Sequence, residues 1–583
     1  MKRNKLKTIA TFALAILLMT GCAGLKKMKK NADKIQYKVT PEVLEAHAGE
    51  VDLAIDGRFP AKYFNKKATL VATPVLKYQG GETAFEPVTL QGEKVQANNK
   101  VIAYSGGNFS YKDDVAFTDA MRLSDLEIRM TATKGKKSLD FEPRKIGTGV
   151  LATSSMVANF PKPILGVRRE ANNTGKYDPY IDPFQRIVPD EMMADIYYLI
   201  NRAEVRKEEV TAEDVQRLEA YIIEAYKADR KELKGVEVSA YASPDGTLDF
   251  NTELAAKREG TSSKYLQEQL KKAGVNIDLK TKYTPEDWEG FKEMMEKSNI
   301  QDKDLILRVL SMYSDPEVRE KEIKNLSNAF TAVAEQILPK LRRAKMISSV
   351  DLIGKTDEEI AALADSDPSK LNPAELLYAA TLTQDLDKQL KIYNSFIKVY
   401  PNDWRGPNNA GLVLVKKMNY KDAKPLFEKA ETLKNNEPII KNNLGAIALY
   451  EGNLAKAEEY FGAAAGAGPE VNYNQGIVNL KKGDYSKAVQ YFRNDTDPNS
   501  ALAKILTNDN NGALKDLESC ELPNCYMKEY LKAVIGARTA KENMLFESLQ
   551  AAVSIKPELK AKAKTDMEFA KYFDNPKFKA IVE

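Results

Sequence analysis

The sequence predicts a multidomain α+β protein with an N-terminal β-sandwich, a central α/β domain and a C-terminal α-solenoid. In the first part of the chain apolar and polar residues alternate, as at Val51, Leu53 and Ile55, which is the period of a half-buried strand. The central part mixes strand-like and helix-like segments, a pattern typical of α/β folds. The last part carries a helical pattern that repeats after 31 to 34 residues, as solenoids do.

The predicted boundaries follow these changes of pattern along the 583 residues, a length that suits three or four domains. We expect a signal peptide at 1–21, a tether at 22–36, the β-sandwich at 37–165, a linker at 166–190, the α/β domain at 191–355, a second linker at 356–372 and the solenoid at 373–583. In the sandwich region, glycine pairs supply turn signals between short alternating strands.

The first 22 residues have the layout of a secretory signal. A basic start, residues 2–7, precedes an apolar run at 9–19 that is too short to span a bilayer. The run ends in Leu18-Met19-Thr20-Gly21-Cys22, which resembles a bacterial lipobox. The resemblance implies a lipoprotein anchored in the outer membrane through palmitate-type acyl chains on Cys22, since two or three chains hold a protein stably. An ordinary cleaved signal with a chance cysteine is the alternative.

Charge and residue counts exclude several classes of function. The net charge is +4, and the four basic residues of the signal account for all of it, so nothing favours nucleic acid as a partner. The single histidine, His47, cannot supply a catalytic triad or a histidine-rich metal site. We therefore expect no enzyme, no metal and no cofactor. Cys520 and Cys525 stand close together in the sequence, and both a disulfide and simple packing remain open.

The central region divides into strands and helices. We expect strands at 195–205, 235–240 and 276–283, with helices after Thr211 and at 251–272. A further helix is expected to begin with Thr284 as its cap and Pro285 at its first position.

The residues of this region resemble the OmpA C-terminal (peptidoglycan-associating) family over about 191–355. The strand ending in Ser243-Pro244-Asp245-Gly246, the pattern Asn251-x₂-Leu254-x₃-Arg258-x₆-Tyr265-Leu266 and the segment 341–347 carry the resemblance. In that family an Asp and an Arg hold the ammonium and the carboxylate of a diaminopimelate side chain, and the planar fork of Arg suits a carboxylate.

The resemblance implies peptidoglycan binding through three residues of this chain. Arg258 occupies the family's arginine position, the family's spacing places its Asp at Ser243, and Asp245 follows two residues later. The motif's Ser and Ala are replaced by Ala255 and Glu259. The alternative is that the fold is kept as a scaffold, in which Arg258 makes only an internal salt bridge.

The C-terminal repeats resemble tetratricopeptide repeats (TPR). Gly411, Gly445 and Gly476 each precede a phenylalanine of a following helix, and these are Phe427, Phe461 and Phe492. The small residues are expected to let two helices cross closely while the aromatic rings fill the space between them. Flanking helices at about 374–400, 500–519 and 526–575 are expected to complete and cap the solenoid.

An asparagine stands two residues before each repeat glycine, at Asn409, Asn443 and Asn474 (two residues before Gly476). In some members of the resembled family this position lines the concave face and hydrogen-bonds the backbone of an extended peptide. An amide both donates and accepts, so a stack of amides reads main chain rather than sequence. The alternative is that Asn is simply a tolerated polar residue on a solvated surface.

These features together predict a non-enzymatic periplasmic scaffold on the outer membrane. Its TPR and β domains would bind protein partners, its OmpA-like domain would contact peptidoglycan, and it would serve an envelope secretion or assembly machine. Residues 23–26 carry no acidic surface-export tag, which favours the periplasmic face. The alternative function is a surface-exposed adhesin or fimbria-type subunit that uses the sandwich outwardly.

Overall fold

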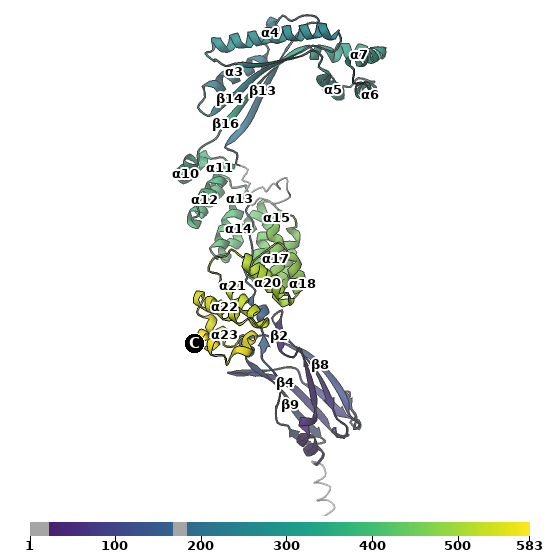
Figure 1. Ribbon diagram of the computed structural model, residues 1–583, viewed down its shortest axis with the longest axis vertical. Helices are drawn as coiled ribbons and strands as arrows, with labels where there is room; N and C mark the ends of the chain where they lie inside the picture. The colour runs from purple at the N-terminus through teal and green to yellow at the C-terminus, as the bar shows by residue number, and fades with distance from the viewer. Residues whose placement is uncertain (1–22, 167–183) are drawn as a thin grey trace, which may run out of the picture. The chain divides into compact units, whose positions relative to one another are not determined.

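The computed structural model describes residues 23–166 and 184–583. The chain forms two compact units (Figure 1). The first unit combines Met1–Pro179 with Asp385–Glu583, and the second, Tyr180–Gln384, is inserted between those two parts. The signal segment and Cys22 lie outside the described residues, so the lipobox stays a prediction. Within residues 23–166 and 184–583, no helix combines the length and the apolar character that spanning a bilayer requires.

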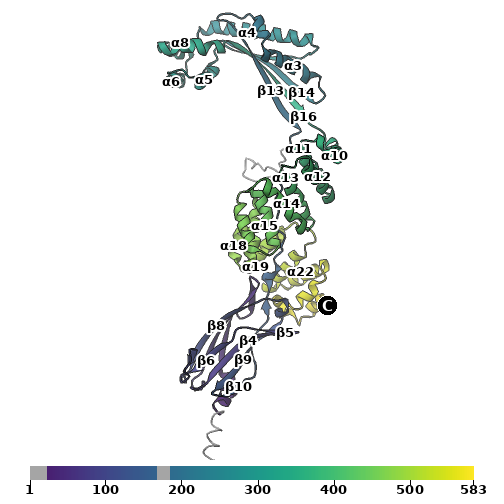
Figure 2. The same ribbon diagram turned by 180° about the vertical axis from the view of Figure 1, so that it is seen from behind.

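The N-terminal part of the first unit contains two β-sheets (Figures 1 and 2). The first sheet has the order β1-β3-β2-β12, with β8 also paired to β3. Its strands are β1 (Gln36–Thr40), β2 (Leu44–His47), β3 (Glu50–Phe59), β8 (Gly107–Ala116) and β12 (Val150–Leu151). The second sheet has the order β10-β9-β4-β6-β7, with β11 paired to β9 and β5 to β4. Its strands are β4 (Thr69–Tyr78), β5 (Gly81–Ala84), β6 (Val88–Gly92), β7 (Lys100–Ile102), β9 (Ser124–Lys134), β10 (Lys137–Asp140) and β11 (Arg144–Thr148).

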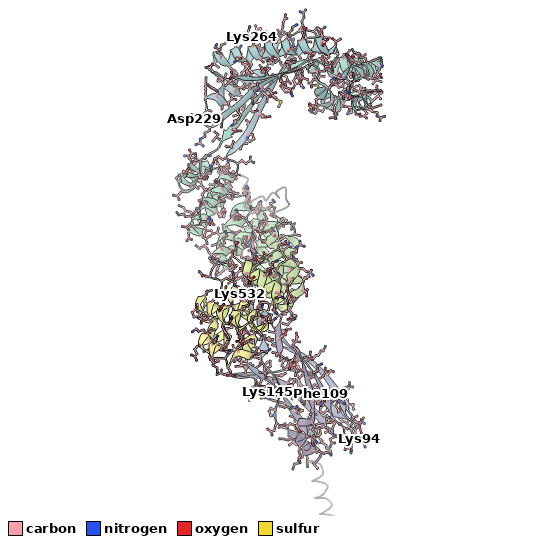
Figure 3. The ribbon with its side chains drawn as sticks, viewed as in Figure 1. Lys94, Phe109, Lys145, Asp229, Lys264 and Lys532 are labelled. Atoms are coloured by element: carbon pink, nitrogen blue, oxygen red, sulfur yellow. The ribbon has the colours of Figure 1, made fainter. Side chains whose placement is uncertain are left out.

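The two sheets share one apolar core, which draws on β3, β4, β8 and β9. Strands β3 and β9 bury every second residue, so the period-two prediction for this region is confirmed. Phe109 of β8, labelled in Figure 3, lies opposite Gly57 of β3. A Cβ at position 57 would stand 1.9 Å from the Phe109 ring, so only glycine leaves room for the ring there.

The tether predicted at 22–36 is wrong for its described part. Residues 23–30 are helical, and Ala32–Lys34 form a 3₁₀ turn. Leu25 and Met28, three positions apart on one helical face, are buried in the core of the sheets. The Tyr63 hydroxyl donates to the Met28 carbonyl oxygen over 3.0 Å. The surrounding lysines made the segment look like solvated linker, but two apolar residues suffice to dock it.

The second unit contains a four-stranded sheet of order β13-β16-β14-β15 (Figure 1). Its strands are β13 (Ile187–Tyr197), β14 (Lys231–Tyr241), β15 (Leu279–Thr284) and β16 (Arg343–Ile353). Two long helices, α3 (Glu213–Lys227) and α4 (Leu248–Lys272), share a core with the sheet. The remaining helices are α2 (Lys207–Val210), α5 (Trp288–Lys297), α6 (Lys303–Met312), α7 (Pro316–Asn325), α8 (Ser327–Gln336), α9 (Leu338–Leu341), α10 (Asp357–Ser366) and α11 (Pro373–Ala379).

Three predictions for the second unit are corrected. The strand expected at 195–205 is β13, which begins inside the predicted linker because its largely exposed residues pair with β16 along its whole length. The helix expected to start at Thr284 is α5, whose cap is Asp287, accepting from the Gly290 amide over 2.8 Å. The linker predicted at 356–372 contains α10, which begins with a capping box of Thr356 and Glu359.

The C-terminal part of the first unit is a solenoid of helical hairpins that resembles TPR repeats (Figures 1 and 2). The three predicted repeats are the helix pairs α13–α14, α15–α16 and α17–α18. The helices are α12 (Leu386–Val399), α13 (Arg405–Lys416), α14 (Tyr420–Leu433), α15 (Pro438–Tyr450), α16 (Leu454–Ala463), α17 (Pro469–Lys481), α18 (Tyr485–Tyr491), α19 (Pro498–Leu506), α20 (Asn510–Ser519), α21 (Tyr526–Arg538), α22 (Glu542–Ile555), α23 (Leu559–Ala563) and α24 (Pro576–Val582). The solenoid was expected from residue 373, but α11 belongs to the second unit.

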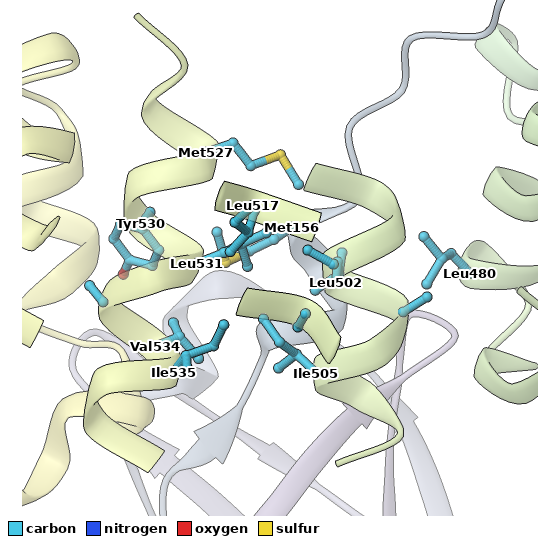
Figure 4. Close-up of a cluster of buried hydrophobic side chains, with 14 of the residues drawn as sticks. Met156, Leu480, Leu502, Ile505, Leu517, Met527, Tyr530, Leu531, Val534 and Ile535 are labelled. Atoms are coloured by element: carbon cyan, nitrogen blue, oxygen red, sulfur yellow. The ribbon is translucent and has the colours of Figure 1, made fainter. Parts of the chain in front are cut away.

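Each repeat glycine lies under the phenylalanine of its partner helix, as predicted. A Cβ on Gly411, Gly445 or Gly476 would stand 2.8, 2.6 or 2.5 Å from the ring of Phe427, Phe461 or Phe492. The C-terminal helices continue this packing into a core in which Met156, from the short 3₁₀ turn Thr153–Met156, lies among leucines of α19, α20 and α21 (Figure 4). The turn that follows the last strand of the sheets therefore contributes a residue directly to the core of the solenoid.

We predict that Gly445→Ala destabilises the first unit by about 1–3 kcal/mol, because the added methyl group overlaps the Phe461 ring. The matched control is Gly462→Ala in α16, where the methyl group would meet no atom within 4 Å. That change should leave stability equal or raise it by up to about 1 kcal/mol. Urea unfolding of the two variants measures the difference, and equal stabilities would refute the close helix crossing.

Candidate functional site

Buried asparagines line successive first helices of the solenoid hairpins. Asn409 of α13, Asn443 of α15 and Asn474 of α17 were predicted from the sequence, and the structure adds Asn499 of α19. Each is at most 1% exposed. A buried amide group needs hydrogen-bond partners for both its oxygen and its nitrogen.

The occupant of this groove is a segment of the same chain, residues 157–166, which we call the strap. The strap follows the 3₁₀ turn Thr153–Met156, and it is bonded by residues that lie 243 to 341 positions further along the chain. The Ile164 amide donates to Asn443 Oδ1 over 2.7 Å, and Asn443 Nδ2 donates back to the Ile164 carbonyl oxygen over 2.8 Å. One side chain thus satisfies both main-chain groups of one strap residue.

The same two-way contact recurs along the strap. The Lys162 amide donates to Asn474 Oδ1 over 2.7 Å, and Asn474 Nδ2 donates to the Lys162 carbonyl oxygen over 2.9 Å. The Ala158 amide donates to Asn499 Oδ1 over 2.9 Å, and Asn499 Nδ2 donates to the Ala158 carbonyl oxygen over 3.0 Å. The Gly166 amide donates to Asn409 Oδ1 over 2.6 Å. From Lys162 to Gly166, successive repeats therefore hold every second residue of an extended backbone.

The strap's sequence fits this alternation. Pro161 and Pro163 have no amide hydrogen, and they occupy positions between the residues that the asparagines bind. Proline also restricts the preceding residue to extended conformations, so the strap is pre-shaped for the groove and loses less entropy on docking. Gly166 allows the last close approach, because a Cβ there would stand 2.9 Å from the Trp404 ring.

A second row of asparagines, which the sequence analysis missed, supports the first. Asn442 Nδ2 donates to the Lys162 carbonyl oxygen over 3.0 Å, and Asn408 Nδ2 donates to that of Ile164 over 3.2 Å. Their oxygens accept from the first row: Asn408 Oδ1 from Asn443 at 2.9 Å and Asn442 Oδ1 from Asn474 at 2.9 Å. The doubled Asn-Asn in two repeats is the signal that could have revealed this row.

Side chains of the strap add contacts at two positions. Ile164 is fully buried in the solenoid core. Lys162 Nζ lies 2.9 Å from Asp495 Oδ1 and 3.5 Å from the centroid of the Tyr473 ring, a cation–π distance. Burial raises the pKa of Asp495, and the Lys162 ammonium lowers it in part.

The arrangement binds a backbone with little reference to side chains. An amide that pairs with both main-chain groups accepts any residue whose side chain points away, proline excepted. The expectation that these asparagines hold a peptide of a partner protein stays a prediction, because the groove positions described here are taken by the strap.

Arg258, the first residue predicted for peptidoglycan, is fully buried in α4. Its guanidinium donates to the carbonyl oxygens of Arg202 (2.9 Å), Tyr241 (2.9 Å) and Leu199 (3.3 Å). Burial lowers its pKa to about 10. The loop at 199–202 and the end of β14 therefore supply the acceptors that a ligand carboxylate would have supplied, which favours an internal role for Arg258. The contacts are with carbonyl groups, not with the carboxylate that the predicted internal salt bridge required.

Ser243 and Asp245, the other two predicted residues, are engaged with Arg342. Asp245 Oδ2 lies 3.2 Å from Arg342 Nη2, and Arg342 Nε donates to Ser243 Oγ over 3.2 Å. The Ser243 hydroxyl also donates to Asp245. In the part of the chain that the structure describes, no hydrogen bond or ion pair joins Asp245 to Arg258, so the two groups do not form a shared carboxylate-and-ammonium grip.

The two C-terminal cysteines are free thiols, with Cys520 buried and Cys525 half-buried. The structure thus has the packing alternative and not the disulfide. Within the described ranges 23–166 and 184–583, no group of three His, Cys, Asp or Glu residues is arranged to hold a metal ion.

Comparison with known proteins gives little further information. No model of a protein family matches the chain, and no curated protein matches it. Similar solved structures include a tetratricopeptide repeat protein from Parabacteroides merdae, at 16% identity and a TM-score of 0.29, over 36% of this chain and 91% of that chain. PilF of Pseudomonas aeruginosa is 13% identical, with a TM-score of 0.29 over 37% and 99%. Yeast Tom70 is 13% identical, with a TM-score of 0.26 over 58% and 88%. At such TM-scores we draw no conclusion from these likenesses.

We predict that Arg258→Met destabilises the second unit by about 3 kcal/mol or more, because three part-buried carbonyl groups lose a charged donor. Binding of the folded variant to purified sacculi should not change. Urea unfolding in a Trp404→Phe background measures the effect, because Trp288 then reports on the second unit alone. The control is Arg202→Met, whose exposed side chain can be removed while its carbonyl group stays. Full stability with lost sacculus binding would instead assign Arg258 to a ligand.

Proposed function

We propose that the protein is a non-enzymatic scaffold of a bacterial cell envelope that holds protein partners. The observation that carries the proposal is the solenoid of helical hairpins, an architecture that offers extended binding surfaces and whose asparagine ladder already holds the chain's own strap. A surface that grips backbone suits attachment, whereas catalysis needs reactive groups gathered in a cleft. A scaffold of this kind would serve an envelope secretion or assembly machine.

In this proposal the groove acts as an internal clasp. The strap belongs to the same chain as the groove, so its effective concentration is on the order of millimolar or higher. A separate peptide with the same main-chain contacts would have to compete with it. We therefore assign partner binding to surfaces outside the groove, and the clasp to holding the sheets and the solenoid together as one body.

We further propose that lipid on Cys22 attaches the first unit to the outer membrane, facing the periplasm. Helical residues 23–30 are docked on the sheets through Leu25 and Met28, so an acylated Cys22 would hold the sheets close to the lipid surface. Exposed Lys26, Lys27 and Lys30 could each add about 1 kcal/mol against anionic head groups. Peptidoglycan binding through Arg258 is not part of the proposal, because the protein's own carbonyl groups use its donors.

The function is tested by replacing Asn409, Asn443 and Asn474 together with alanine. We expect amide exchange in the strap to rise at least tenfold, since the substitutions remove the two-way contacts of Asn443 and Asn474 and the hydrogen bond from the Gly166 amide to Asn409, each worth ~1 kcal/mol or more. Partner proteins cross-linked in intact cells should still be recovered. The control replaces Asn402 and Asn435, which are exposed.

Circular dichroism of the triple variant establishes whether its helices persist. If the triple variant unfolds, the single variant Asn443→Ala is used in its place. Partner cross-links that vanish from a folded variant would place the partners in the groove and overturn the clasp. A protein that yields no discrete partners in either form would sink the scaffold proposal.

The anchor is tested by Cys22→Ser. We expect this variant to lose palmitate incorporation and to leave the membrane fraction, whereas Cys520→Ser, a change at a buried thiol, should keep both properties. Protease treatment of intact cells then separates a periplasmic scaffold, which should stay uncut, from a surface adhesin or fimbria-type subunit, which should be cleaved. Palmitate that survives in the Cys22 variant would contradict the anchor.

A further inference from the structure

A cavity of about 680 Å³ lies in the first unit, apart from the asparagine-lined groove. Its lining comes from the loop that leads into the 3₁₀ turn Asp119–Arg122, from Ser155 and from the end of α23. Its lining residues are Phe117, Thr118, Asp119, Arg122, Ser155, Lys562 and Thr565. The volume lies within the range of small-molecule sites.

Arg122 stands at this cavity as a deeply buried cation, only 5% exposed. Its Nε donates to Asp119 over 2.8 Å, and its Nη2 donates to Ser155 Oγ over 2.9 Å. Its Nη1 is buried and has no hydrogen-bond partner in the part of the chain that the structure describes. The Asp119 side chain is 82% exposed, so water screens the charge that it offers to Arg122.

Lys562 brings a second cation to the same cavity. Burial, helped by the positive charge of Arg122, lowers its pKa to about 8, while Asp566 and Asp119 act in the opposite direction. The Lys562 ammonium lies 5.2 Å from the centroid of the Tyr530 ring. Asp566, whose charge acts on Lys562, accepts instead from the Tyr530 hydroxyl over 2.8 Å. Among residues 23–166 and 184–583, no carboxylate lies within ion-pair distance of Lys562.

The cavity thus holds two cations against one solvent-exposed carboxylate. A desolvated positive charge without a counter-ion is costly, and an anion that enters the cavity removes part of that cost. Thr118 borders the same space, and its hydroxyl group can donate to an oxyanion, whereas the Thr565 hydroxyl already donates to the Lys562 carbonyl oxygen over 3.1 Å. The Phe117 ring, 5.6 Å from the Arg122 guanidinium, offers an apolar wall beside these polar groups.

We infer that this cavity binds the carboxylate group of a small organic acid, with Lys562 as its ion-pair partner, Arg122 as the supporting charge and Phe117 against its apolar body. One uncompensated positive charge matches a monoanion better than a phosphate dianion. The volume exceeds what a single inorganic ion fills, which leaves room for a carbon skeleton of several atoms.

The test measures how fast an amine-directed acylating reagent modifies Lys562 in the full chain at pH 8, with benzoate as the probe. Benzoate, acetate, phosphate and chloride are compared at constant ionic strength. An ion-paired ammonium holds its proton more tightly, so benzoate should slow Lys562 acylation saturably by about tenfold or more. Lys564, two residues on and exposed, should react at an unchanged rate.

Thermal unfolding supplies a second readout. Benzoate should raise the midpoint of the wild-type chain and of Lys564→Met saturably, and should not raise that of Lys562→Met. Lys562 is chosen because substitution of the buried Arg122 could unfold the chain. Equal protection by all anions, no protection, or a midpoint shift that survives in Lys562→Met would overturn the site. Stronger protection by phosphate than by benzoate would overturn the assignment to carboxylates.

Discussion

The structure of the first unit depends on the hydrogen bonds between solenoid asparagines and the strap. The unit is discontinuous in sequence, because the second unit is inserted between its two parts. Four asparagines of one row, backed by two of another, pair with the backbone of residues 158–166. Each contact contributes about 1 kcal/mol net, and their alignment along one extended segment makes them act together.

The clasp forms because the spacing of the groove asparagines matches the spacing of alternate residues in the strap. The first helices of successive hairpins present their amides at a spacing that matches two residues of extended chain, at Lys162, Ile164 and Gly166. Pro161 and Pro163 occupy the positions before and after Lys162, where no amide hydrogen is needed. Met156, just before the strap, enters the core of the C-terminal helices, so apolar packing and main-chain hydrogen bonds fasten the same segment.

The sequence revealed the groove but not its occupant. The position of Asn409, Asn443 and Asn474 before the repeat glycines was readable, because a helix repeats its faces at a fixed period. The strap was read as the end of the sandwich and the start of a linker, because its prolines are typical of both. No pattern within the strap indicates that its hydrogen-bond partners lie more than two hundred residues further along the chain.

Other features of the structure could not be predicted from the sequence for the same reason, namely that they depend on contacts between distant parts of the chain. Arg258 was found from its motif, but its partners are carbonyl groups, which have no signature in the sequence. The docked helix at 23–30 was hidden because Leu25 and Met28 are few among lysines. Strand β13 was misplaced because most of its side chains are exposed and do not alternate. Patterns that lie within one element could be predicted, whereas contacts between distant main-chain groups could not.

Hydrogen exchange along the strap tests the central claim most directly. In the full chain, the amides of Lys162, Ile164 and Gly166 should exchange slowly, since each donates to an asparagine, and the amide of Leu165 should exchange much faster. Uniformly fast exchange at all four amides would contradict the clasp.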